Sequence, residues 1–201
     1  MNQAIATIIK NKIAGLDFVD KISGLVSAQS ISVGKGDDIV TKTYPVACCT
    51  TADCCKSGAY NDLCPDSKYK TVIYFEDGGV SFERAESNWK YYTSNLRLVC
   101  WINVAKILND CCYTEDTCTL SAHLITEIIR ELPEFPYNEA PFSRLYFEVT
   151  DQVIRNNSIF SAYTYNEKQV QYLMYPYDYF ALDIKASFGI CMTSTVTPST
   201  C

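Results

Sequence analysis

The sequence has little of several residue types on which common protein chemistries depend. It holds 1 histidine in 201 residues, which excludes a metal site built from several histidines. No run of residues approaches the roughly 18 apolar residues of a membrane-spanning helix, so no membrane partner is expected. The phosphate-binding frame G-x-x-x-x-G-K-[ST] is missing, since Gly34-Lys35-Gly36 does not fit it.

Positive charge is also scarce. The chain has 17 Lys and Arg against 23 Asp and Glu, which gives a formal net charge of -6. This balance argues against a surface that grips nucleic acid through neutralised phosphates, although DNA could still slide past it. The start of the chain, residues 1–10, has neither a basic region nor a long apolar run, so we expect a protein made and kept in a cytoplasm.

Apolar and aromatic residues are plentiful. Hydrophobic residues make up 48% of the chain and charged residues 20%, so the sequence predicts a folded core rather than disorder. The length fits one domain over residues 1–201. Tyrosine occurs 15 times. Its ring can be buried while its hydroxyl stays in contact with water, which suits both sheet packing and subunit interfaces.

The most regular stretch is Tyr177–Cys191. Every second residue from Phe180 to Ile190 is apolar, while the residues between them, such as Asp183 and Lys185, are polar or small. Because side chains alternate faces along a strand, this pattern predicts one long half-buried strand. Roughly 14 residues at about 3.3 Å each would reach about 46 Å, which is long for a globular strand.

The other elements follow from the same reasoning about periodicity and turn residues. Thr71–Glu76 and Val80–Arg84 flank Asp77-Gly78-Gly79, which predicts a hairpin with its turn at the glycines. Further predictions are amphipathic helices over 2–14 and Leu120–Leu132, a short helix from Val104–Leu108, strands at Ser30–Val33, Ile39–Val46 and Tyr91–Ile102, a strand or short helix at Phe142–Val149, and short extended pieces at Ser158–Tyr165 and Val170–Tyr175.

These elements define an α+β fold. We expect a mixed or antiparallel sheet with Tyr91–Ile102 at its centre and the long C-terminal strand beside it, packed by the N-terminal and the central amphipathic helix. A cysteine-rich loop at about 47–69 would be inserted between two strands. Residues 192–201 are rich in Thr and Ser and are expected to form a flexible tail.

The cysteines allow several interpretations. Cys48, Cys49, Cys54, Cys55 and Cys64 cluster in the loop, but adjacent Cys-Cys pairs rarely direct both sulfurs to one zinc ion. Disulfides formed after release from a reducing cell are a second reading, and thiols in a packed or loosely ordered loop are the favoured one. The number of cysteines, 11, is odd, so at least one is unpaired within the chain.

Catalytic machinery is not evident. His123 could be imagined as the base of a cysteine nucleophile, but it lies within the predicted helix Leu120–Leu132 and no motif surrounds it. A histidine on the helix surface is the simpler interpretation. The acidic pairs, such as Asp37-Asp38 and Glu115-Asp116, fall in turns and read as solvated loops, so the chain is expected not to be an enzyme and to need no cofactor.

The order of elements resembles a known class. It is similar to the small α+β proteins that form rings in the neck of tailed bacteriophages, the tail terminator and tail-completion family. Short stretches of the sequence also resemble neck ring proteins of crAss-like phages. The resemblance is carried by Lys42-Thr43-Tyr44-Pro45-Val46-Ala47, Ser94–Val104 and Gln171–Ile190, with Tyr175-Pro176-Tyr177-Asp178-Tyr179-Phe180 the most distinctive stretch. The cysteine-rich segment 48–64 departs from that family's usual short hairpin loop.

This resemblance implies a structural virion protein, assembled in the host cytoplasm. Copies would form a closed ring between head connector and tail, contacting other neck, portal or tail proteins, with DNA passing through the lumen without sequence-specific binding. The loop and the tail could order on assembly. Candidate subunit contacts are Tyr91, Tyr92, Tyr172, Tyr175, Tyr177 and Tyr179. The alternative function is a cysteine-rich binding module stabilised by zinc or disulfides.

Overall fold

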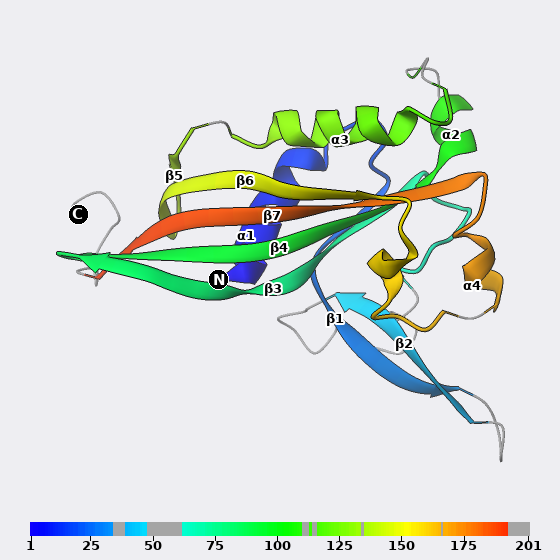
Figure 1. Ribbon diagram of the computed structural model, residues 1–201, viewed down its shortest axis with the longest axis horizontal. Coiled ribbons are helices and arrows are strands. Elements are labelled where there is room, and N and C mark those ends of the chain that lie inside the picture. The colour runs from blue at the N-terminus through cyan, green and yellow to red at the C-terminus, as the bar shows by residue number, and fades with distance from the viewer. Residues whose placement is uncertain are drawn as a thin grey trace.

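A computed structural model describes residues 1–33, 39–47, 62–109, 113, 116–133, 135–165 and 167–192. Most of the cysteine-rich loop and of the C-terminal tail therefore lies outside the described residues. Within them, seven strands form one mixed sheet in the order β2-β1-β3-β4-β7-β6-β5 (Figure 1). The elements are α1 (Asn2–Ile13), β1 (Lys21–Val33), β2 (Val40–Ala47), β3 (Thr71–Glu86), β4 (Trp89–Asn103), α2 (Val104–Asn109), α3 (Leu120–Glu131), β5 (Tyr137–Glu139), β6 (Phe142–Ile154), η4 (Asn157–Phe160), α4 (Glu167–Gln171) and β7 (Tyr177–Cys191).

The predicted α+β architecture is confirmed. β1 and β3 run parallel, and the other neighbouring strands of the sheet run antiparallel. β4 stands in the middle of the strand order, as expected for Tyr91–Ile102, and β7 is one strand of 15 residues. β1 and β6 are each 13 residues long, so both extend well beyond the pieces expected at Ser30–Val33 and Phe142–Val149.

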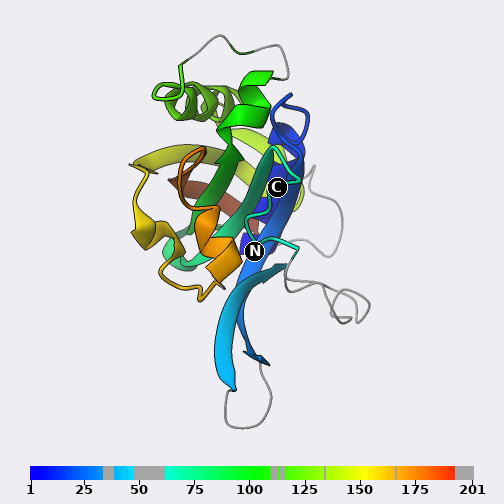
Figure 2. The ribbon, with the colours of Figure 1, turned by 90° about the vertical axis from the view of Figure 1, so that its right-hand side faces the viewer.

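One face of the sheet is covered by helices. α1 and α3 lie across this face, and α1 contributes Ile5, Ile9 and Ile13 to the core with no exposed surface (Figures 1 and 2). Leu124 and Ile128 of α3 pack against the alternate residues of β4 and β7 that the sequence pattern placed on the apolar face. Each such buried side chain contributes about 1.5–3 kcal/mol through the hydrophobic effect, and the cluster on this face is the larger of the two cores. None of the described helices has the length and apolarity needed to cross a membrane.

A second, smaller core lies on the opposite face and covers only one half of it. Trp101 of β4 is its largest member, and its indole Nε1 donates a hydrogen bond of 2.6 Å to the carbonyl of Tyr172. Much of the cover is made by residues 157–165 and 167–173, which the sequence analysis expected to be extended at Ser158–Tyr165 and Val170–Tyr175. That expectation is wrong. The segment forms η4, α4 and turns instead, because it must fold back over the sheet to bury Ile159, Phe160 and Tyr165.

The predicted turn at Asp77-Gly78-Gly79 is also wrong. β3 continues through these residues as one strand, and the chain reverses at Ser87 and Asn88, between the paired residues Glu86 and Trp89. The glycines form a β-bulge, a place where extra residues enter one strand. Gly79 has φ +89, and a Cβ on Gly78 would lie 2.9 Å from the carbonyl oxygen of Asn95, so both positions require glycine.

Two strand pairs extend beyond the two cores. β1 pairs with β3 only from Lys21 to Leu25, and its later residues pair with β2 alone, which forms an arm that leaves the sheet (Figures 1 and 2). At one end of the long axis, the residues of β3 from Asp77 onward are exposed and pair with β4 alone. We call residues 77–93 the β3–β4 arm. Beneath it, the sheet face opposite the helices is open, and we call this the open face.

Candidate functional site

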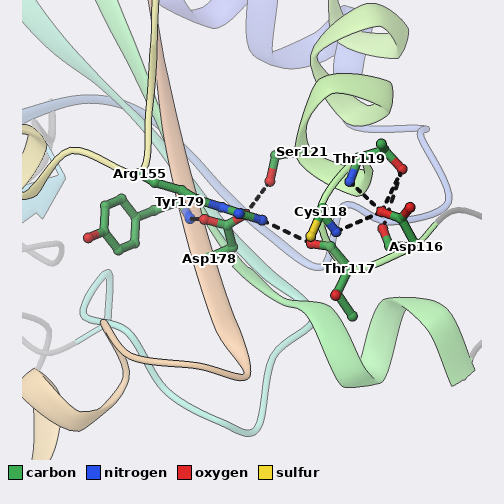
Figure 3. Close-up of polar contacts among 8 residues, drawn as sticks. All are labelled: Asp116, Thr117, Cys118, Thr119, Ser121, Arg155, Asp178 and Tyr179. Carbon is green, nitrogen blue, oxygen red and sulfur yellow. Dashed lines mark hydrogen bonds and ion pairs between the residues drawn. The ribbon is translucent and has the colours of Figure 1, made fainter.

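One site that gathers polar side chains in a hollow lies where β7 begins. A cavity of about 310 Å³ is lined by Val104, Thr117, Cys118, Arg155, Leu173, Tyr175, Tyr177, Asp178 and Tyr179. We call it the Asp178 cavity (Figure 3). Its residues come from the start of α2, the turn before α3, the residue after β6, the turn after α4 and the start of β7, so five parts of the chain meet here.

Asp178 is the centre of the polar contacts. It is 4% exposed, and its carboxylate accepts a hydrogen bond of 2.5 Å from the hydroxyl of Ser121 in α3. Arg155 Nε donates to the same carboxylate over 2.8 Å, and Arg155 Nη2 donates to the carbonyl of Thr117 over 2.9 Å. A buried carboxylate is costly unless it is paired and hydrogen-bonded, and here both conditions are met. The network therefore fastens α3 and the end of β6 to β7.

The turn before α3 is held by a second carboxylate. Asp116 accepts hydrogen bonds from the backbone N–H groups of Cys118 and Thr119, each over 2.8 Å, and from the Thr119 hydroxyl over 3.0 Å. These bonds favour the charged form of Asp116 and therefore lower its pKa. The backbone N–H groups of Thr119 and Cys118 make the largest contributions. The turn places the exposed thiol of Cys118 at the wall of the Asp178 cavity (Figure 3).

The lining of the cavity does not combine its cysteine with a histidine base. A cysteine nucleophile needs a base within hydrogen-bond reach, and the residues that line the cavity include no histidine. His123 lies instead on α3, where its Nε2 is 3.3 Å from Glu127 Oε1 and its ring meets Tyr113 edge-on. The cavity therefore does not pair Cys118 with His123, the histidine that the sequence analysis considered as the base of a cysteine nucleophile. What remains is a hollow with an aromatic wall and a compensated ion pair.

The cysteine cluster is only partly described. Cys48, Cys49, Cys54 and Cys55 lie outside the described residues, and Cys64 is 2% exposed within the second core. Burial raises the pKa of the Cys64 thiol to about 12, which opposes the thiolate form that zinc requires. Cys64, Cys100 and Cys118 carry thiols outside any disulfide, whereas Cys191 is disulfide-bonded. Across the described part of the chain, no three His, Cys, Asp or Glu side chains are grouped to hold a metal ion.

The six candidate interface tyrosines fall into two groups at opposite ends of β7. Tyr91 and Tyr92 lie on the β3–β4 arm, where Tyr91 faces the open face and Tyr92 stacks on Phe188 on the helical side. Tyr172, Tyr175, Tyr177 and Tyr179 lie at the Asp178 end. Of these, Tyr175 is 83% exposed, whereas Tyr179 is 6% exposed in the second core and Tyr177 stacks on Trp101.

The sequence contained a signal for Asp178 that the analysis passed over. Asp178 is in phase with Phe180 and Leu182, so it is an acidic residue on the buried face of a strand. Such a residue needs a donor and a cation nearby. Arg155, 23 residues away and following a different strand, carried no comparable signal.

Comparison of the chain with protein-family models gives no match, and comparison with curated proteins gives none either.

Proposed function

We propose that this protein is a structural subunit of a tailed-phage neck or tail, and that its copies form a closed ring around the DNA channel by contacts between unlike surfaces. The proposal starts from the resemblance of the chain to neck ring proteins. The observation that supports it best is the position of two exposed apolar surfaces at opposite ends of one rigid sheet.

The first surface is the β3–β4 arm. Val80 and Phe82 lie opposite Ser94 and Tyr92, on the helical side of the sheet, and are 40% and 56% exposed. Phe82 meets the ring of Tyr92 edge-on at 5.7 Å between centroids, and Tyr92 stacks on Phe188. The arm therefore presents an apolar side chain that is held in place by aromatic neighbours, which is the character of an interface anchor.

The second surface is the wall of the Asp178 cavity. Tyr175 lines this hollow and is 83% exposed, and Met174, its neighbour in the chain, is 64% exposed. The hollow is large enough to receive one side chain. The register of β4 with β7 places this wall and the tip of the β3–β4 arm at opposite ends of β7, because Asn103 pairs with Tyr177 and Trp89 with Cys191. Contacts that join one end of each copy to the other end of the next are heterologous, and such contacts close into rings when the rotation allows.

The oligomeric state tests the proposal. We expect the purified protein, or the particle that contains it, to show cyclic oligomers by light scattering and imaging. Phe82→Ser and Tyr175→Ser should each reduce the oligomer to smaller species, whereas Phe135→Ser, which removes another apolar side chain with 75% exposure, should not. A chain that is strictly monomeric within the mature particle would contradict the ring.

A mixing experiment tests the unlike surfaces directly. The Phe82→Ser copy keeps an intact Tyr175 wall, and the Tyr175→Ser copy keeps an intact arm. Mixed together, the two variants should form dimers through one intact contact and stop there. An interface that uses the same surface on both copies would not be restored by mixing.

A further inference from the structure

The open face of the sheet carries a hollow whose charged lining residues are mostly basic. This hollow of about 260 Å³ lies beneath the β3–β4 arm and is lined by Arg84, Arg144 and Lys185, with Glu83 as the one acidic residue among its described lining. We call it the Arg144 hollow. Thr93 and Ser187 also line it, and these two lie directly opposite each other in the register of β4 with β7. Two adjacent hydroxyl-bearing residues therefore share a hollow with three cationic side chains.

Two of these cations are available to a ligand. Lys185 lies opposite Glu148 in the register of β7 with β6, yet neither Lys185 nor Arg144 forms an ion pair with any residue that the structure describes. Arg84 pairs with Glu86 over 2.7 Å and stacks over the ring of Tyr91 at 4.7 Å, which holds its guanidinium in place at the surface. The hollow thus has fixed positive charge that internal partners only partly neutralise.

The backbone at Arg144 is held in an unusual conformation. Its φ is 52, in the left-handed region that non-glycine residues rarely adopt, and it lies in a bulge of β6 between Ser143 and Tyr146. The carbonyl oxygen of the Asn138 side chain accepts a hydrogen bond of 3.1 Å from the Arg144 N–H, which supports this conformation. Disfavoured backbone conformations persist where the surrounding structure imposes them, and they are concentrated at ligand-binding positions. Here the bulge places the Arg144 guanidinium at the wall of the hollow.

We propose that the Arg144 hollow binds a phosphate group of a nucleic-acid backbone. A phosphate presents several oxygens in a tetrahedron, so it can accept from guanidinium and ammonium donors at its sides and from hydroxyl donors beneath it. The choice of nucleic acid as the source of the phosphate rests on the proposed function, in which DNA passes the protein. The contact is to the backbone, so it is independent of base sequence. The chain as a whole is acidic, so we expect the contact with the phosphate to be confined to this hollow.

Binding should be measured by fluorescence anisotropy with a short labelled DNA duplex at several salt concentrations. The assembly-deficient Tyr175→Ser chain is titrated beside the wild type, since Tyr175 lies at the far end of β7 from the hollow. Because the hollow holds one phosphate, it predicts a slope of log K against log salt of about −0.9, and the double variant Arg144→Gln/Lys185→Gln should bring this slope close to zero. The matched control Lys10→Gln/Arg130→Gln removes the same charge from α1 and α3 and should leave the slope unchanged.

The outcomes separate this proposal from the ring. Failure of the wild-type and Tyr175→Ser chains to bind the duplex at low salt would overturn it, as would equal slopes for the double variant and the control. Binding of inorganic phosphate at the hollow without binding of the duplex would overturn nucleic acid as the source. DNA binding is measured on a chain that does not assemble. The absence of rings would therefore not change the interpretation of the binding measurement, and the absence of DNA binding would not contradict the ring.

Discussion

Arg97 of β4 and Asp183 of β7 face each other across the open face and form two parallel hydrogen bonds, 2.6 Å from Nε to Oδ1 and 2.8 Å from Nη2 to Oδ2. The side chains are 37% and 29% exposed, so water weakens the attraction but does not remove it. The pair joins the two central strands at the point where the second core ends and the open face begins.

A double-mutant cycle with Arg97→Ala and Asp183→Ala should give a coupling energy of about 1 kcal/mol, because two-point geometry places this pair at the upper end for exposed ion pairs. The matched control is Arg84 with Glu86, whose side chains are 62% and 56% exposed. Its coupling should stay below about 0.5 kcal/mol. Urea unfolding measures both cycles, and equal coupling energies would contradict the role of the two-point geometry.

Glu76 should destabilise the protein at neutral pH. Burial raises its pKa above the usual value of 4.5, although the hydroxyl of Tyr163 donates to its carboxylate over 2.6 Å and opposes this shift. Because the pKa of Glu76 is higher in the folded state, its carboxyl makes its full contribution to the free energy of unfolding below pH 4.5. This contribution is lost as the pH rises through the folded-state pKa. Glu76→Gln should therefore raise the melting temperature at pH 7 and have less effect at pH 4, as followed by circular dichroism. Glu148→Gln, at an exposed position of β6, serves as the control and should show no such pH dependence.

Asp178 should contribute far more to stability than its single charge suggests. Asp178→Ala leaves the buried Ser121 hydroxyl without its acceptor and Arg155 without its carboxylate, so we expect a loss of about 2–4 kcal/mol. Ser121→Ala removes one hydrogen bond and should cost about 1–2 kcal/mol. Denaturant unfolding tests this order, with the exposed Asp151→Ala as a control. A cost for Asp178→Ala no larger than that for Ser121→Ala would show that the ion pair with Arg155 contributes nothing.

Thiol reactivity should differ sharply between two cysteines. Cys64 is buried and its pKa is raised to about 12, so its thiol remains protonated below that pH. Iodoacetamide followed by mass spectrometry should modify the exposed Cys118 in the folded protein and Cys64 only in denaturant. The same pKa predicts that stability falls as pH rises from 9 toward 12, because the unfolded thiol ionises first. Rapid modification of Cys64 in the native chain would contradict its place in the second core.

The bulge in β3 should tolerate neither of its glycines being replaced. Gly78→Ala brings a Cβ to 2.9 Å from the carbonyl oxygen of Asn95, and Gly79→Ala forces an L residue to φ +89. We expect a loss of about 1 kcal/mol or more for each. Gly15→Ala, which meets nothing within 4 Å, is the control and should be neutral or slightly stabilising when thermal unfolding is compared.

The parts of the fold that could be predicted depend on periodicity along one segment. The alternation in Tyr91–Ile102 and Tyr177–Cys191 and the stripes of α1 and α3 are properties of neighbouring residues, and each was confirmed. The bulge at Asp77-Gly78-Gly79 was not foreseeable, because its reason is Asn95 on another strand. The true turn at Ser87 and Asn88 contains no glycine, so it carried the weaker signal.

The polar sites were harder to predict for a similar reason. The Asp178 cavity depends on Arg155 and Thr117, and the Arg144 hollow depends on four strands, β3, β4, β6 and β7, that meet only in the folded sheet. An acidic sequence gives no sign that Arg84, Arg144 and Lys185 are gathered on one face. Their grouping is a product of register, which is set by the whole sheet rather than by any one segment.

The first bulge of β3 exchanges the faces on which its side chains lie, and the second bulge exchanges them back. Before Asp77, odd-numbered residues such as Phe75 face the helices, whereas between the bulges Val80 and Phe82 face that side. The second bulge, between Phe82 and Arg84, restores the original phase. If the pairing of Asp77 with Leu96 continued without a bulge, Val80 would lie opposite Thr93 and Phe82 opposite Tyr91, so both apolar side chains would be on the open face. Because of the bulge, Ser81 lies opposite Thr93 instead. The position of one bulge therefore determines whether this part of the open face is apolar or polar.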